Sequence, residues 1–223
     1  MPRIARAVAA GFPHHVVQRG NNRQSVFFEE DDRGRYLSLL AKYSKKWDAP
    51  ILAYCLMSNH VHLLIKPQQE ESLYKMMQGM TLCYTQHINR QYSRTGRLWE
   101  SRYHSCIVDN DSYRWAVARY IEQNPVRAKI VTLPEDYPHS SARAHFGLEK
   151  SATLCDDLFY ESQRNDYIMF IRGEIEEGQL KDIRNSLKTG RPLSSNKCLK
   201  DIEEKLARKL GAQPIGRPRK KIH

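Results

Sequence analysis

Paired cysteines, long apolar runs and nucleotide-binding loops are all missing from the sequence, and each absence removes a class of protein. The five cysteines lie far apart and form no Cys-x-x-Cys pair, so neither a disulfide framework nor a zinc ribbon is expected. No apolar run approaches the roughly 18 residues that a membrane span needs. No Gly-x-x-x-x-Gly-Lys-[Ser/Thr] or Gly-x-Gly-x-x-Gly loop is present. We therefore expect a protein of the reducing cytoplasm that uses neither a membrane nor a nucleotide cofactor.

Acidic residues are also in short supply. The chain of 223 residues carries 36 lysines and arginines against 25 aspartates and glutamates, which gives a formal net charge of +11. Such an excess of positive charge is typical of proteins that bind polyanions, with nucleic acid as the first candidate. Solubility alone is the simpler alternative. A hydrophobic content of 40% is enough for a sizeable core.

The most informative stretch is 56–65, which has the pattern of a strand, a Ser-Asn turn and a second strand. Side chains at i and i+2 of a strand point to the same face, so His60 and His62 share one face. The opposite face carries Val61, Leu63 and Ile65. Two adjacent imidazoles on a rigid strand can chelate a metal, although a His-x-His pair by itself also occurs in strands that bind none.

The spacing of apolar residues predicts an α+β protein. Predicted strands cover 14–19, 51–57, 60–66 and 102–108. Predicted helices run from 31 to before Pro50, from 71 to 92 and from about 109 to 124. The first six elements have the order βαββαβ, which is the ferredoxin-like split arrangement with a four-stranded antiparallel sheet. Both crossover helices then cover one face, and the third helix is free to cover the other.

Val61, Leu63 and Ile65 form the more apolar face of their strand, so we expect that face to pack against the two crossover helices. The histidine pair then points to the other side of the sheet, toward the third predicted helix. Along this helix Tyr113, Val117, Tyr120 and Asn124 form one line, since each follows the previous one by three or four residues. A tyrosine hydroxyl and a carboxamide one turn apart could therefore both reach a metal held by the two histidines.

Three residues near the end of this helix compete as a third metal ligand. At about 100° per residue, Asn124 lies about 40° from Tyr120, and Gln123 lies about 60° away on the other side. Glu122 lies about 160° away and is a poor candidate, although a carboxylate is the better ligand by chemistry. We take Asn124 as the third ligand, with Gln123 as the alternative.

A polar loop after the first predicted strand is a candidate DNA contact. Arg19 and Arg23 are suited to phosphates, and Asn22 and Gln24 can hydrogen-bond base edges; Asn21 belongs to the same loop. The alternative is an ordinary polar turn.

Three motifs occur in order: the loop RGNNRQ at 19–24, His60-Val61-His62, and the run RYIEQNPVRA at 119–128. Together, over about residues 13–146, they resemble the REP-associated tyrosine transposases, a single-tyrosine branch of the HUH single-strand nucleases. The resemblance implies a ferredoxin-like fold, a divalent metal and a covalent 5′-phosphotyrosyl DNA intermediate. The implied substrate is a palindromic repeat hairpin, cut in the single-stranded DNA beside it.

The resemblance also implies roles for individual residues. His60 and His62 match the metal ligands and Tyr120 matches the nucleophile. Asn124 stands where that branch has an amide ligand four residues after the tyrosine, although mobile relatives have Gln there. Mg²⁺ or Mn²⁺ suits such a mixed nitrogen and oxygen site. The resemblance also bears on the oligomeric state. Mobile relatives act as dimers, whereas members of the repeat-associated group look more like monomers, so we expect this protein to be a monomer.

The last third of the chain departs from this core. We expect a nuclease domain at 1–146 and a partly helical extension at 147–223. A Gly-Arg-Pro tripeptide occurs at 190–192 and again at 216–218. Arg217 and Arg219 in the basic tail resemble an AT-hook that enters a narrow minor groove. The alternative is a solvated basic tail.

Two other functions remain open on the sequence alone. A former nuclease could bind hairpins without cutting them, although the presence of His60, His62 and Tyr120 argues against this. An RNA-binding ferredoxin-like domain is the third reading, but its strands lack paired aromatic residues of the RNP type.

Overall fold

The computed structural model describes residues 6–109, 113–154 and 158–211. At its centre is an antiparallel sheet with the strand order β2-β3-β1-β4. The strands are β1 (His14–Arg19), β2 (Ile51–Met57), β3 (His60–Ile65) and β4 (His104–Ile107). With α1 (Glu30–Lys46) after β1 and α2 (Ser72–Gln91) after β3, the chain has the order βαββαβ. The ferredoxin-like prediction is confirmed.

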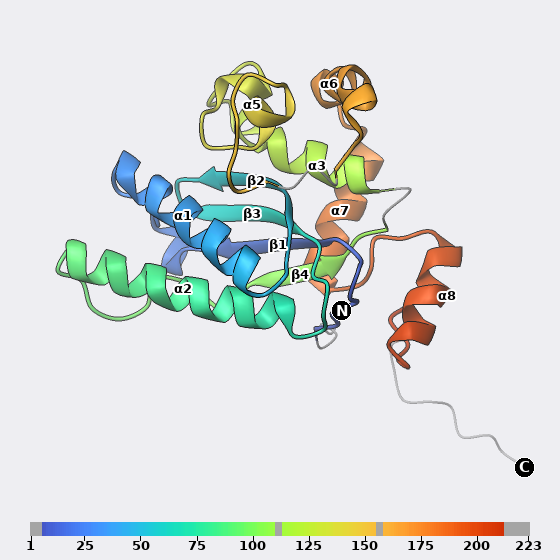
Figure 1. Ribbon diagram of the computed structural model, residues 1–223, viewed down its shortest axis with the longest axis horizontal. Coiled ribbons are helices and arrows are strands. Elements are labelled where there is room, and N and C mark those ends of the chain that lie inside the picture. The colour runs from blue at the N-terminus through green and yellow to red at the C-terminus, as the bar shows by residue number, and fades with distance from the viewer. Residues whose placement is uncertain (1–5, 110–112, 155–157, 212–223) are drawn as a thin grey trace, which may run out of the picture.

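The two faces of the sheet carry separate hydrophobic clusters. Val61, Leu63 and Ile65 pack with α1 and α2, as the strand alternation predicts. Leu64 and Cys55 belong to the cluster on the other face, which includes the helix α3 (Arg114–Glu122). Figure 1 shows α1 and α2 along one side of the sheet and α3 on the other.

The third helix is shorter than the sequence indicated. It ends at Glu122 rather than Asn124, and a short helix α4 (Asn124–Arg127) follows after a break at Gln123, which has φ −84° and ψ 2°. Pro125 explains the break, because a proline inside a continuous helix lacks the backbone N–H and clashes with the preceding turn. In the first turn of a new helix a proline causes no such loss. Residues 110–112, near the start of the predicted helix, lie outside the described residues.

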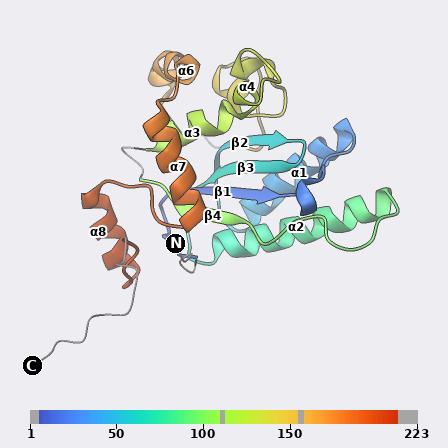
Figure 2. The same cartoon turned by 180° about the vertical axis from the view of Figure 1, so that it is seen from behind.

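The C-terminal part adds α5 (Ala142–His145), α6 (Arg164–Arg172) and α7 (Glu177–Thr189) on the same side of the sheet as α3. A further helix, α8 (Asn196–Lys205), packs through Ile202 with Ala9 and Ile107 in a separate small cluster. The chain also has short 3-10 turns, η1 (Asn21–Arg23), η2 (Pro134–Asp136) and η3 (Glu161–Gln163). Tyr167, Ile171 and Ile183 are buried in the cluster that contains α3, and Figure 2 shows α7 between α6 and β4. Apolar contacts therefore cross residue 147, and the division into domains there stays a prediction.

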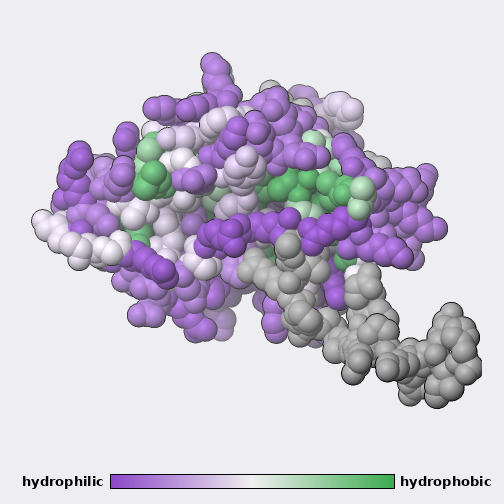
Figure 3. Space-filling view, turned by 90° about the horizontal axis from the view of Figure 1, so that it is seen from below, coloured by the Kyte–Doolittle hydropathy of each residue, from purple (hydrophilic) through white to green (hydrophobic). Residues whose placement is uncertain are grey.

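The exterior agrees with the polar composition. The face in Figure 3 is mostly hydrophilic, with hydrophobic side chains confined to limited areas. Within the described part of the chain, no helix combines the length and apolar character needed to cross a membrane. The four cysteines described there, Cys55, Cys83, Cys106 and Cys198, are free thiols.

A buried carboxylate ties α3 to the C-terminal helices. Glu122 is fully buried, and its carboxylate accepts hydrogen bonds from Ser141 Oγ, from His145 Nδ1 at 2.6 Å and from the Tyr167 hydroxyl at 3.0 Å. Ser141 and His145 lie at the two ends of α5, and Tyr167 lies on α6. One carboxylate thus supplies the acceptor for three donors that have little access to water.

We expect Glu122→Ala to lower the free energy of unfolding by at least about 3 kcal/mol, because it leaves three buried donors without an acceptor. Glu122→Gln keeps one acceptor oxygen and should lose less. The matched control is Glu149→Ala, which removes a half-exposed carboxylate paired with Arg143 and should cost under about 1 kcal/mol. Urea unfolding measures all three. A Glu122→Ala loss as small as that of Glu149→Ala would contradict the assignment.

His14 gives the fold a dependence on pH. Its ring is fully buried: Nδ1 donates to the Phe12 carbonyl at 2.8 Å, and Nε2 accepts from the Ala9 N–H. Burial lowers the pKa of His14 to about 4. Between the ordinary value of 6.5 and this value the unfolded chain holds the extra proton, so stability falls as the pH falls through that range.

We expect the wild type to lose about 2 kcal/mol more stability than His14→Asn between pH 7.5 and pH 5, at about 1.4 kcal/mol per pKa unit. Asn keeps a donor for the Phe12 carbonyl but does not titrate. Urea unfolding of both proteins at the two pH values measures the difference. If both proteins lost the same free energy of unfolding between the two pH values, His14 would not be the cause of the pH dependence.

Candidate functional site

A cavity of about 470 Å³ lies on the face of the sheet opposite α1 and α2. His60 and His62 from β3, Tyr120 from α3 and Asn124 from α4 all line it. The structure therefore brings together the four residues that the sequence singled out for chemistry. They come from two segments that are far apart in the sequence.

The two histidines of β3 line the cavity and have the same ring nitrogen already hydrogen-bonded. Their ring centroids lie 5.0 Å apart with the planes nearly perpendicular. Nδ1 of His60 is hydrogen-bonded to Asn59 Oδ1 at 2.6 Å, and Nδ1 of His62 to His15 Nε2 at 3.0 Å. In both rings Nε2 is the nitrogen left for a further partner.

His15 is a part of the site that the sequence reasoning missed. It is fully buried on β1, stacked on His62 with 5.3 Å between ring centroids. Its own Nδ1 is buried without a hydrogen-bond partner among the described residues. The signal was available: β1 alternates, and pairing Val17 with His62 places His15 on the same face.

All three rings are held neutral by their surroundings. Burial, with Arg19 nearby, lowers the pKa of His60 to about 4. Burial also lowers the pKa of His15 to about 3, and that of His62 well below its ordinary value, with the neighbouring imidazoles adding to the shift. Each ring therefore keeps an unprotonated nitrogen at neutral pH, which is the form that binds metals.

Tyr120 is directed at this group of imidazoles. Its ring centroid lies 5.7 Å from that of His62 and 5.6 Å from that of His15, edge to face in both cases. The guanidinium of Arg127 lies 4.3 Å from the centre of the tyrosine ring, and its Nη2 donates to the Tyr120 carbonyl at 2.6 Å. Arg127 was not singled out from the sequence, although it lies in the same run.

The three candidates for a third ligand are separated by the structure. Asn124 lines the cavity, and its amide nitrogen donates to the carbonyls of Tyr120 and Ile121, which leaves the amide oxygen for a ligand. Gln123 instead donates to the carbonyls of Ile171 and Gly173 at the end of α6. Glu122 is committed to its buried hydrogen bonds, as described above. Of the three, Asn124 is the one at the cavity.

The loop at 19–24 begins beside the same cavity, which Arg19 lines. Arg19 pairs with His60 across the sheet and lines the cavity, whereas Asn21, Asn22, Arg23 and Gln24 form the adjoining turn. A Cβ on Gly20 would lie 2.2 Å from the Gln24 carbonyl oxygen, so the turn requires glycine there. Hydrogen bonds from the Gly20 N–H to the Asn59 carbonyl, and from the Asn59 amide to the Arg23 carbonyl, hold the turn against the β2–β3 hairpin.

The two Gly-Arg-Pro copies have different outcomes. Arg217 and Arg219 lie outside the described residues, so their role stays a prediction. The first Gly-Arg-Pro copy is part of the fold, because Gly190 caps the end of α7 in the left-handed conformation, with φ 75°. Leu193, just after it, exchanges backbone hydrogen bonds with Ile107 and Asp109. This copy therefore serves as a helix cap.

The donor set at this cavity consists of two histidines and one amide, so a metal bound here would keep coordination positions that the protein does not fill. Among the described residues, no group of three or more His, Cys, Asp or Glu side chains is arranged to hold a metal ion. The side chains of His60, His62 and Asn124 nevertheless line the same cavity, and their hydrogen bonds leave two imidazole nitrogens and one amide oxygen for a ligand. Such a mixed donor set suits a divalent cation that completes its shell with oxygen atoms of water or of a phosphate.

Comparison with known proteins agrees with this geometry. A Haemophilus influenzae protein described as a REP-associated tyrosine transposase is 25% identical over 100 residues, which cover 40% of this chain and 57% of that protein. A solved structure of a REP-associated tyrosine transposase bound to a REP hairpin matches with a TM-score of 0.58 and 17% identity, over 79% of this chain and 99% of that one. The structural match shows a shared fold.

The model of the IS200-like transposase family matches residues 10–124, about half of the chain. That segment holds β1, the histidine pair, Tyr120 and Asn124. This match confirms the resemblance seen in the motifs: the chain belongs to the IS200-like transposase family.

Proposed function

We propose that the protein cuts and rejoins single-stranded DNA beside a palindromic repeat hairpin, through a covalent bond between Tyr120 and a 5′-phosphate. The observation that supports this most directly is the common cavity of Tyr120, His60, His62 and Asn124. The relative whose structure contains a REP hairpin supports the choice of substrate. The net charge of +11 favours a polyanionic substrate in general.

The reaction exchanges one phosphodiester for another. The Tyr120 hydroxyl gives up its proton as its oxygen attacks the phosphorus and forms a new O–P bond, the bond from phosphorus to the 3′ oxygen breaks, and the departing 3′ oxygen takes up a proton. The reverse reaction rejoins the strand without an external energy source, in keeping with the absence of nucleotide-binding loops. A free tyrosine is mostly neutral at pH 7, so the site must stabilise negative charge on the phenol oxygen.

Arg127 contributes to that stabilisation. Its guanidinium lies over the Tyr120 ring, and its hydrogen bond to the Tyr120 carbonyl fixes it there. Burial lowers the pKa of Arg127, but an arginine remains charged at neutral pH. A fixed positive charge beside the attacking group costs no reorganisation during the reaction.

His60, His62 and Asn124 would hold Mg²⁺ or Mn²⁺. The tautomer that this metal binding requires of His15 accounts for a buried nitrogen, Nδ1 of His15, that has no hydrogen-bond partner among the described residues. When bound, the cation polarises the phosphate and stabilises the leaving oxygen. Ligation through Nε2 requires the proton on Nδ1, and both histidines have an acceptor there: Asn59 Oδ1 for His60 and His15 Nε2 for His62. His15 must then carry its own proton on Nδ1, which has no partner, at a cost of about 1–3 kcal/mol.

Incubation of the wild type with a labelled repeat hairpin carrying a single-stranded flank and Mn²⁺ should yield a protein–DNA adduct on a denaturing gel. Tyr120→Phe should abolish the adduct, because it removes the attacking oxygen, and a chelator should prevent it. Tyr113→Phe is the matched control, since Tyr113 caps the start of the same helix, and it should keep the adduct. An adduct with Tyr120→Phe would refute the nucleophile. Tight, chelator-insensitive hairpin binding without any adduct would favour a non-catalytic binding protein.

Replacing His15 should weaken metal binding without removing a ligand. We expect His15→Ala to raise the Mn²⁺ dissociation constant about 10- to 100-fold, because the proton on His62 Nδ1 loses its acceptor. His15→Gln supplies an acceptor oxygen at a similar reach and should restore most of the affinity. Calorimetric titration of Mn²⁺ into the Tyr120→Phe protein measures binding separately from cleavage, with His14→Asn as the control. An unchanged constant in His15→Ala would contradict this role.

A further inference from the structure

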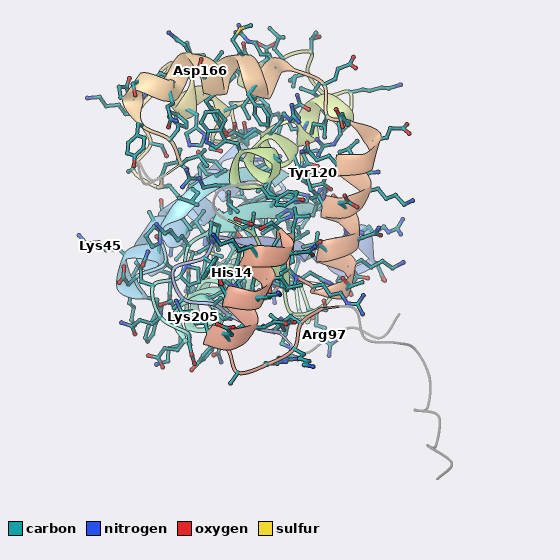
Figure 4. The ribbon with its side chains drawn as sticks, turned by 90° about the vertical axis from the view of Figure 1, so that its right-hand side faces the viewer. His14, Lys45, Arg97, Tyr120, Asp166 and Lys205 are labelled. Atoms are coloured by element: carbon teal, nitrogen blue, oxygen red, sulfur yellow. The ribbon has the colours of Figure 1, made fainter. Side chains whose placement is uncertain are left out.

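Helix α7 lines the cavity although it lies outside the segment that the family model matches. The match ends at residue 124, whereas α7 covers Glu177–Thr189. Arg184, Leu187 and Lys188 of this helix share the cavity with Tyr120 and His62. Figure 4 shows Tyr120 beside α7. The core family residues therefore supply one wall of the cavity, and the C-terminal segment supplies another.

α7 is held in place at both ends and in the middle. Near its start, Arg119 of α3 donates to Gln179 Oε1 at 2.7 Å. Ile183, at its centre, is 1% exposed within the cluster shared with α3. After its end, Leu193 pairs with the edge of β4, and Asp109 accepts from the N–H and hydroxyl of Ser195. Side chains on the free face of α7 therefore have a defined position relative to the cavity.

The charges on this wall are positive and exposed. Arg184 and Lys188 are one helical turn apart and open to solvent, at a rise of about 6 Å along the helix axis. Arg184 is close enough to Arg127 to contribute to the lowered pKa of that residue. Together with Arg19, three cations line the cavity against one carboxylate, Glu100. Three positive charges against a single carboxylate, among the described residues that line the cavity, indicate a site for an anionic ligand.

We propose that Arg184 and Lys188 form a phosphate-binding site for the single strand next to the bond that is cut. This rests on the proposed function. Successive phosphates of an extended strand follow one another at a spacing that two side chains one turn apart can match. Leu187 lines the same cavity and offers an apolar surface to a sugar or base. The strand would then pass between α7 and the sheet, with its phosphate backbone against the helix.

The test compares two double variants that remove the same charge. Arg184→Ala/Lys188→Ala changes the proposed wall, and Lys42→Ala/Lys45→Ala changes exposed residues on α1, on the opposite side of the sheet; Figure 4 shows Lys45 far from α7. Both are made in the Tyr120→Phe protein. Binding of a fluorescent single-stranded oligonucleotide is measured by anisotropy in a chelator, at several salt concentrations.

We expect the α7 double variant to bind at least 10-fold more weakly, and its salt dependence to decrease by about 1.4 log units per log unit of salt, for two lost phosphate contacts. The α1 variant should bind as the parent does. Arg184→Lys/Lys188→Arg preserves the charge and should retain most of the affinity. Because all these residues are exposed, urea unfolding should be unchanged, which separates lost contacts from lost structure.

Two results would overturn this proposal. The first is binding by the α7 variant with the affinity and salt dependence of the α1 variant. The second is faster adduct formation when the α7 changes are made with Tyr120 intact, because α7 would then obstruct the strand. The first result does not depend on whether Tyr120 is the nucleophile, since binding is measured without cleavage; the second applies where the wild type forms the adduct. Conversely, if the proposed tyrosine–DNA adduct were disproved, weaker oligonucleotide binding by the α7 variant would still support a phosphate-binding site on α7.

Discussion

The site depends on burying imidazoles while keeping them neutral. His62 is enclosed by the sheet, by α3 and by two further imidazoles, and burial is the largest cause of its lowered pKa. A protonated ring in that position would lack both water and a counter-charge. The protein instead gives Nδ1 of His60 and Nδ1 of His62 a neutral partner, so the orientation of these two rings is fixed before any ligand arrives. This preorganisation has a stability cost, which is visible in the unpartnered Nδ1 of His15.

The helix that bears Tyr120 is fixed by residues far from the cavity. Glu122 follows Tyr120 by two positions and therefore points the opposite way around the helix. There it meets donors from α5 and α6, while Gln123 binds the end of α6. The tyrosine side of the helix meets the histidines, and the other side meets the C-terminal helices. Residues beyond 124 therefore help to set the rotation of α3 over the sheet.

The sequence predicted the parts of this arrangement that depend on local periodicity. Alternation in β3 placed His60 and His62 opposite the apolar set, and helical spacing placed Tyr120 above them. Contacts between strands needed the register, which is why His15 was missed. The end of α3 was misplaced because the effect of Pro125 on the preceding turn was underestimated. The contribution of α7 depends on contacts with β4 and α3 that follow from tertiary packing alone.

Pro125 has a further effect on the neighbouring asparagine. A proline cannot donate to the carbonyl four residues earlier, which is that of Ile121, and the amide of Asn124 donates to this carbonyl and to that of Tyr120 instead. Turning the amide over would set its oxygen against two carbonyl oxygens. These two backbone carbonyls therefore decide the orientation of the Asn124 amide and leave its oxygen for a ligand. A glutamine, one methylene longer, would have to reach a cation without this double anchor.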